Sequence, residues 1–249
     1  MGDNAAQQNK KKKTKWGTPY LAMTIREAEG HLGVRISQLK TVSVQTILAN
    51  AGHDFEVLDA KEKVYDQIVQ YLDVEGYPED SDPDFKEANI SDLVYGIIGP
   101  AIQFMRKKTK CMIRLAREKE IVFVDNETGG AEWPLGLDLI SVAEGRFVFI
   151  VEAMQSAFGQ AKKQVLLSMK DAGDNNGGGT VYGFITTGEL WQMFCYDGKG
   201  FCETRRMVAL FDGMSENKGL WMKDCSVLVD CLVAALSIGD IVERDVVVA

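Results

Sequence analysis

The stretch RFVFIVE at residues 146–152 decides the predicted fold, because β-branched and aromatic side chains fill nearly all of it. A Glu-Gly pair at residues 144–145 separates it from LGLDLISV at residues 135–142, so the two runs are predicted to form a β-hairpin. EIVFVD at residues 120–125 is a third run of the same kind. Together the three runs predict consecutive strands of one sheet.

Helical periodicity flanks these strands on both sides. Apolar side chains recur at helical spacing over residues 89–108, around Gly99 and Pro100, and again over residues 158–169. Further strands and a closing amphipathic helix are predicted downstream, at residues 181–187, 191–196, 201–210 and 220–236. The order α-β-β-β-α-β, followed by a hairpin and a helix, predicts an α/β (α+β) fold in which helices flank a mixed sheet.

The N-terminal third is predicted to lie outside this unit. Residues 1–17 are expected to be a basic, disordered tail, because they lack apolar periodicity. Residues 18–85 are expected to be a small helical lobe that ends in an acidic linker around Pro78 and Pro83. Residues 86–249 then form the main domain.

Composition places the chain among soluble globular proteins. Of its 249 residues, 46% are hydrophobic and 26% are charged, and no window approaches the ~18 consecutive apolar residues of a spanning helix. We therefore expect no membrane association. The five cysteines are odd in number and form no CxxC pair, which predicts a reducing compartment, the nucleus or the cytoplasm. The lysine run at residues 10–13 is either a nuclear-import signal or a solubilising tail.

Charge is distributed unevenly along the chain. The net charge is −8, and because residues 1–15 carry +4, the remainder carries −12. An acidic body repels phosphate on average, so nucleic-acid binding requires a local basic patch. One such patch precedes the predicted first strand, and a solvated helix face is its alternative interpretation. Its basic residues are Arg106, Lys107, Lys108, Lys110, Arg114, Arg117 and Lys119.

Two acids stand within the apolar strands. Asp138 lies inside the second predicted strand and Glu152 ends the third. An unpaired carboxylate in an apolar sheet is costly, and two such groups on neighbouring strands are suited to share a divalent cation such as Mg²⁺. Alternatively, both acids lie at strand ends and face water.

The order of these features resembles the PD-(D/E)xK nuclease superfamily. Asp138 on the second strand is followed by VEAM at residues 151–154 on the third, by Gln164 on the next helix, and by VYGFITTG and WQMF at residues 181–188 and 191–194. The chain is most similar to a restriction-endonuclease-like branch found in fungi and related eukaryotic microbes. The resemblance covers residues 87–238.

The resemblance implies specific roles for individual residues. Asp138 and Glu152 become ligands of Mg²⁺ or Mn²⁺, and Gln164 faces the active site from the helix. Glu127 is a candidate third ligand, with a simple surface acid as the alternative. Nucleic acid is the implied substrate, DNA being favoured over RNA, and a protein partner is also open. The residues expected to contact nucleic acid are Arg106, Lys107, Lys108, Lys110, Lys162 and Lys163.

One position departs from the family pattern. Met154 occupies the place of the superfamily lysine, and a thioether neither carries charge nor donates a proton. Three interpretations stay open: a substitution that inactivates a toxic enzyme, transfer of the lysine's function to Lys162 or Lys163, or a natural pseudo-nuclease. The expected function is thus a metal-dependent nuclease that is impaired or inactive as written. The alternative is a non-catalytic module that binds nucleic acid or protein.

Overall fold

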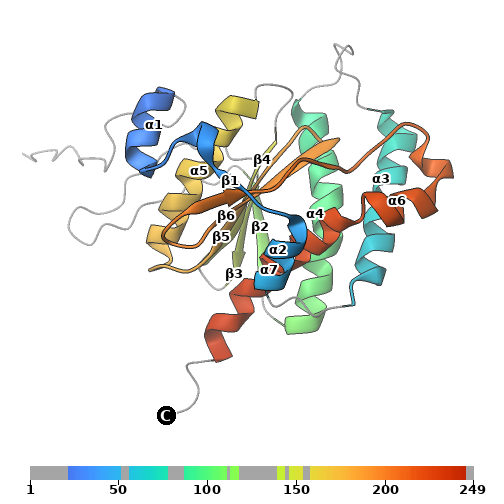
Figure 1. Cartoon of the computed structure of the whole chain (residues 1–249). Helices are drawn as coiled ribbons and strands as arrows, with labels where there is room; N and C mark the ends of the chain where they lie inside the picture. Colours follow the sequence, from blue (N-terminus) through green and yellow to red (C-terminus); the bar gives the residue numbers. More distant parts are fainter. Residues whose placement is uncertain are drawn as a thin grey trace, which may run out of the picture.

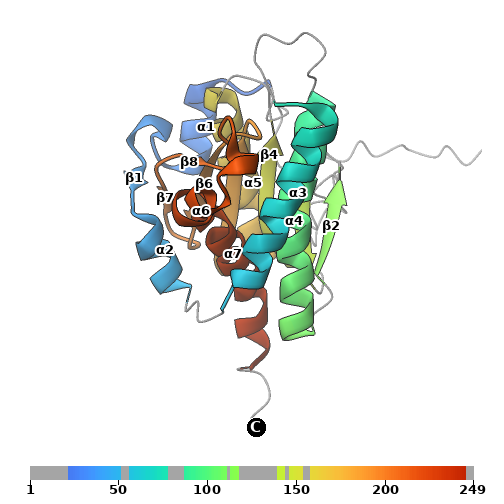
Figure 2. The ribbon, with the colours of Figure 1, turned by 90° about the vertical axis from the view of Figure 1, so that its right-hand side faces the viewer.

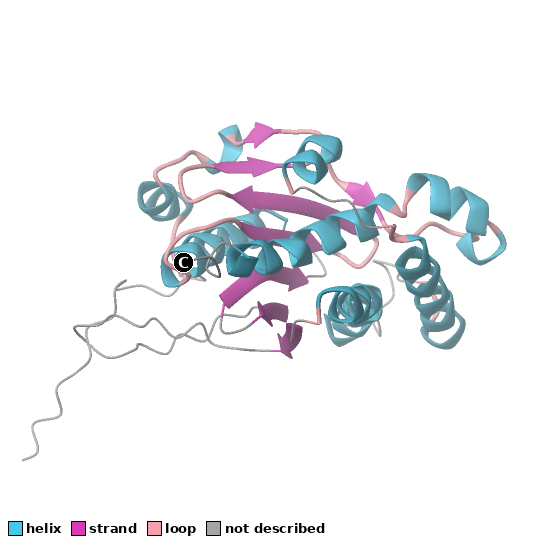
Figure 3. Cartoon of the chain, turned by 90° about the horizontal axis from the view of Figure 1, so that it is seen from below, coloured by secondary structure: helices cyan, strands magenta, loops and turns pink. Residues whose placement is uncertain are grey.

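The fold comes from a computed structural model (Figure 1). It describes residues 22–51, 56–77, 87–110, 113–117, 139–143, 146–153 and 158–244. The architecture is mixed α/β, as predicted, with helices flanking a mixed sheet (Figure 3).

The sheet has the strand order β1-β7-β6-β5-β4-β3-β2, and β8 pairs with β6 off this path. Strands β4 and β5 are parallel, as are β1 and β7, and the other pairs are antiparallel. The bounds are β1 Lys40–Thr41, β2 Ile113–Arg117, β3 Leu139–Ala143, β4 Arg146–Ala153, β5 Val181–Thr186, β6 Leu190–Tyr196, β7 Phe201–Glu203 and β8 Met207–Val208.

Local sequence explains where several helices begin and end. Thr24 and Glu27 form a capping box at the start of α1, and Gly33 ends that helix in the left-handed conformation that glycine tolerates. Ser43 caps α2 through the backbone N–H of Thr46. The helices are α1 Ile25–Leu32, α2 Val44–Asn50, α3 Leu58–Glu75, α4 Glu87–Thr109, α5 Phe158–Asn175, α6 Lys218–Asp224 and α7 Val227–Arg244. Short 3₁₀ turns lie at Ile36–Gln38 and Met214–Glu216.

The two faces of the sheet are buried by different helices. Along β4, Phe149 and Val151 pack in a cluster with α4 and α7, whereas Ile150 packs in a second cluster with α5 and α1. This alternation is the two-residue period of a strand buried on both sides. Odd-numbered β4 residues therefore face α4, and even-numbered ones face α5.

Most predicted elements are present, with shifted boundaries. The third predicted strand corresponds to β4, the second to β3, and the helix at residues 158–169 extends through α5 to Asn175. The strand predicted at residues 120–125 lies outside the described residues. Instead, β2 is formed by Ile113–Arg117, so part of the predicted basic patch belongs to a strand. The closing helix is divided into α6 and α7 near Cys225, and the run at residues 201–210 is divided into β7 and β8.

The N-terminal helices share the core of the main domain. Val64 and Ile68 of α3 belong to the same buried cluster as Ile97 of α4 and Phe184 of β5. Figures 1 and 2 show α3 and α4 side by side, and the Tyr71 hydroxyl donates to the carbonyl oxygen of Asn89 (2.9 Å). Packing is thus continuous across the boundary predicted at residue 85, and the division into domains stays a prediction.

Among the described helices, none combines the length and the apolar character needed to cross a membrane.

Candidate functional site

Glu152 lies at the carboxyl end of β4. Its side chain is 5% exposed, and its position in the strand places it on the face covered by α5, the same face as Ile150. Its neighbour on β5 is Ile185, which is fully buried. An ionisable group thus lies in a layer of apolar side chains, which is one of the two interpretations that the sequence left open.

Helix α5 covers this end of the sheet with its first turns. Because β4 and β5 are parallel, α5 must run antiparallel to both, and its N-terminal half lies over their carboxyl ends. Gln164, in the second turn, is 6% exposed. Glu152 and Gln164 therefore belong to the same layer, between the sheet and α5.

Gln164 is the first of three buried polar residues along one flank of α5. Ser168 and Asp171 follow it at helical spacing, and both are fully buried. The opposite flank carries Lys162, which is about 200° away from Gln164 around the helix. Lys162 faces β7, so the polar flank faces the other way, towards β4 and β3. Ser168 and Asp171 were not among the predicted site residues, although their helical spacing from Gln164 is visible in the sequence.

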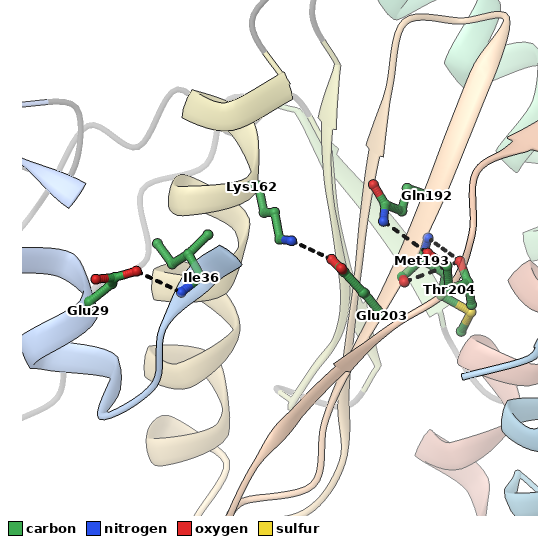
Figure 4. A network of polar contacts seen from close by, with 7 residues as sticks. All are labelled: Glu29, Ile36, Lys162, Gln192, Met193, Glu203 and Thr204. Atoms are coloured by element: carbon green, nitrogen blue, oxygen red, sulfur yellow. Dashed lines mark hydrogen bonds and ion pairs between the residues drawn. The ribbon is translucent and has the colours of Figure 1, made fainter. Parts of the chain in front are cut away.

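Lys162 and Lys163 have structural contacts of their own. The Lys162 ammonium forms an ion pair with Glu203 of β7 (2.5 Å), which Figure 4 shows. The Lys163 side chain is 1% exposed and donates a hydrogen bond to the carbonyl oxygen of Met23 (2.6 Å). Burial lowers the pKa of Lys163 below its ordinary value. These contacts argue against the prediction that either lysine replaces the one missing at position 154 or binds nucleic acid.

The other predicted ligands fall outside the described residues. They are Asp138 and Glu127, so the distance between Asp138 and Glu152 is untested. Met154, at the position of the superfamily lysine, also lies outside the described residues. Within the described ranges, no group of three or more His, Cys, Asp or Glu side chains is arranged to hold a metal ion. Since two of the three predicted ligands lie beyond those ranges, the metal site stays a prediction.

The basic patch borders a hollow beside the C-terminal half of α4. Arg106, Lys107 and Lys110 line this hollow of about 700 Å³, together with the half-exposed ring of Tyr95. Lys108 is exposed in the same last turns. Basic residues in the last turn also interact favourably with the helix dipole. This stabilisation of α4 explains the basic residues without any bound nucleic acid.

The hollow lies beside α4, which packs on one face of the sheet, whereas the Glu152 side chain lies on the other face. Helix α4 packs on the face of Val151, and α5 packs on the face of Glu152. The patch and Glu152 therefore lie on opposite sides of the described sheet, and nucleic-acid binding by the patch stays a prediction.

Comparison of the chain with protein-family models, with curated proteins and with solved structures finds no match.

Proposed function

We propose that the chain is a metal-dependent phosphodiesterase of the PD-(D/E)xK type, in which Asp138 and Glu152 bind Mg²⁺ or Mn²⁺. Met154 leaves its hydrolytic activity weak or absent. DNA is the favoured substrate. The restriction-endonuclease-like core is part of this proposal.

The position of Glu152 carries the proposal. Its buried carboxylate lies at the carboxyl end of β4, in the layer beneath α5 that also holds Gln164. Leu139, which directly follows Asp138 in the sequence, pairs with Val151, which directly precedes Glu152. The element order α4-β2-β3-β4-α5-β5 is the order that the resemblance implies.

The chain's own residues suit a hard dication. Carboxylate oxygens are the ligands that Mg²⁺ prefers, and it is commonly bound through one or two of them. A bound ion would polarise the phosphate and lower the pKa of a coordinated water. In this proposal Gln164 holds a phosphate oxygen or a ligand water by hydrogen bonding, since its amide both donates and accepts.

The absence of a lysine at position 154 limits the expected rate. Removing one preorganised electrostatic group from an active site costs on the order of 10²–10³ in rate. Lys162 and Lys163 are engaged with Glu203 and with Met23, so neither supplies an obvious substitute. We therefore expect the chain to bind Mg²⁺ or Mn²⁺ but to hydrolyse phosphodiester bonds weakly or not at all.

Plasmid and RNA cleavage in Mn²⁺ tests the proposal. Met154→Lys should cleave at least about 10²-fold faster than the parent chain, and the double variant Met154→Lys/Glu152→Gln should lose that gain. Leu220→Lys, which adds a lysine at an exposed position of α6, is the matched control and should leave the cleavage rate of the parent chain unchanged. Equal cleavage by the single and double variants would contradict the proposal, because Glu152 would then have no part in catalysis.

A non-catalytic binding module is the second candidate. The hollow lined by Arg106, Lys107, Lys110 and Tyr95 favours it, since basic side chains beside an exposed ring suit a phosphate backbone with unstacked bases. In that case neither the parent chain nor Met154→Lys cleaves, and both retain nucleic acid in a filter-binding assay. Loss of that retention at high salt would identify phosphate contacts as its source.

A further inference from the structure

Cys195 and Cys202 face each other across the β6–β7 hairpin. They are register partners in the antiparallel pair, and the side chain of each is half-buried. Both thiols lie on the same face of the sheet, because directly opposed residues of an antiparallel pair project to the same side. The pair is thus close in space, partly accessible and free of any existing disulfide.

Backbone hydrogen bonds define the kind of pair. The Asp197 N–H donates to the carbonyl oxygen of Gly200 in the turn, and the Thr204 N–H donates to the carbonyl oxygen of Met193 further along. Since hydrogen-bonded and non-bonded pairs alternate, Cys195 and Cys202 form a hydrogen-bonded pair. Such pairs have Cα atoms about 5.5 Å apart, within the range of about 4.4–6.8 Å that a disulfide spans.

The surroundings differentiate the two thiols. A hydrogen bond from the Cys195 thiol lowers the pKa of Cys202 to about 7. Lys40, which is the register partner of Cys202 on β1, also lowers this pKa, whereas burial and the charge of Asp197 raise it. The same hydrogen bond, together with burial, raises the pKa of Cys195. Cys202 is therefore the better nucleophile at neutral pH, and Cys195 keeps its proton.

The other described cysteines differ from this pair. Cys231 is fully buried, its Sγ lies 3.7 Å from Sδ of Met207, and burial raises its pKa to about 12. Cys225 is also buried, and burial raises its pKa. Among the four cysteines that the structure describes, reactivity should thus be concentrated at the hairpin.

We propose that Cys195 and Cys202 are a reversible oxidation site, which a peroxide converts into a cross-strand disulfide. The Cys202 thiolate attacks one peroxide oxygen, the O–O bond breaks, and the departing hydroxide takes a proton to leave as water. Cys195 then attacks the sulfenic sulfur, and its proton leaves with the hydroxyl group as a second water. Two thiols are oxidised and one peroxide is reduced.

The proposed disulfide at Cys202 lies next to the ion pair that joins β7 of the sheet to α5. Glu203 directly follows Cys202, and its carboxylate holds Lys162 of α5. A covalent link at Cys202 therefore fixes the strand that anchors α5 through this ion pair. The inference does not depend on the proposed function.

Peptide mapping of the full chain tests the proposal. Trypsin cleaves after Lys199 within the turn, so the two cysteines fall in separate peptides, residues 171–199 and 200–205. After treatment with equimolar hydrogen peroxide and alkylation, these two peptides should be recovered joined, with two hydrogens lost, and dithiothreitol should separate them. Cys225 and Cys231 should remain alkylatable after denaturation.

Single variants separate the two roles. Cys195→Ser should accumulate a sulfenic acid at Cys202 that dimedone traps, whereas Cys202→Ser should react with peroxide at least about tenfold more slowly than the parent. Cys225→Ser is the control and should form the link as the parent does. Recovery of unlinked peptides from the parent chain, or equally fast oxidation of Cys225 and Cys231, would overturn the proposal.

Discussion

At Gly183 the backbone of β5 approaches α5 too closely for a side chain. A Cβ atom there would lie 2.7 Å from Cγ2 of Val165 and would also collide with Sδ of Met169. We expect Gly183→Ala to lower the free energy of unfolding by about 1–3 kcal/mol, because overpacking displaces core side chains. Urea denaturation measures the change.

Gly96 of α4 offers the matched control for this substitution. A Cβ there meets nothing within 4 Å, so Gly96→Ala should stabilise the protein by roughly 0.5–1 kcal/mol through helix propensity alone. An equal free energy of unfolding for Gly183→Ala and Gly96→Ala would contradict the close packing of β5 against α5.

At the residue scale, the structure buries two of the predicted site residues, Glu152 and Gln164, but the contacts of Lys163 were not predicted. Glu152 was singled out because a carboxylate after VFIV conflicts with its apolar context, whereas Gln164 was identified through the resemblance to the PD-(D/E)xK superfamily. Lys163 was expected to be available for nucleic acid, but it is buried. Its burial depends on the carbonyl oxygen of Met23, which is 140 residues away in the chain, and no local pattern encodes such a contact.

Among the elements, α5 and β7 are joined by the pair Lys162–Glu203. Both side chains are less than one-fifth exposed, and the charged atoms lie 2.5 Å apart. We expect a double-mutant cycle with Lys162→Met and Glu203→Gln to give a coupling energy of about 1 kcal/mol, measured by thermal or urea unfolding. The pair Lys218–Glu62, which is 3.9 Å apart and about half exposed, should give a coupling near zero in the same cycle. Equal couplings would contradict the stabilising role of the less exposed pair, Lys162–Glu203.

Strands were predictable where their pattern was apolar and uninterrupted. β4 and β5 carry long apolar runs because both of their faces are buried. β2 was missed because Arg114 and Arg117 stand within it, and its five residues read as part of a basic run. Charged residues are common on edge strands, which is the position that β2 occupies in the described sheet. β1 spans two residues, lies outside every predicted strand and arises from its pairing with β7.

For the molecule as a whole, the described helices of residues 22–77 should unfold together with the rest. Ile68 of α3 is 1% exposed in the main cluster, and Lys61 of α3 pairs with Asp230 of α7 at 2.7 Å. Ile68→Ala should therefore lower the global free energy of unfolding by about 2–5 kcal/mol, in a single transition. Hydrogen exchange should report similar protection in α3 and α4. Loss of protection confined to α3 would instead support the separate lobe that the sequence predicted.

The proposed metal site of the chain centres on Glu152, and electron paramagnetic resonance of Mn²⁺ tests it most directly. Free Mn²⁺ gives a sharp signal that binding removes, and the measurement does not depend on residue 154 or on turnover. The parent chain should bind Mn²⁺ competitively with Mg²⁺, and Glu152→Gln and Asp138→Asn should each abolish binding while the fold is retained, as checked by circular dichroism. Undiminished Mn²⁺ binding by Glu152→Gln would contradict the proposed metal site.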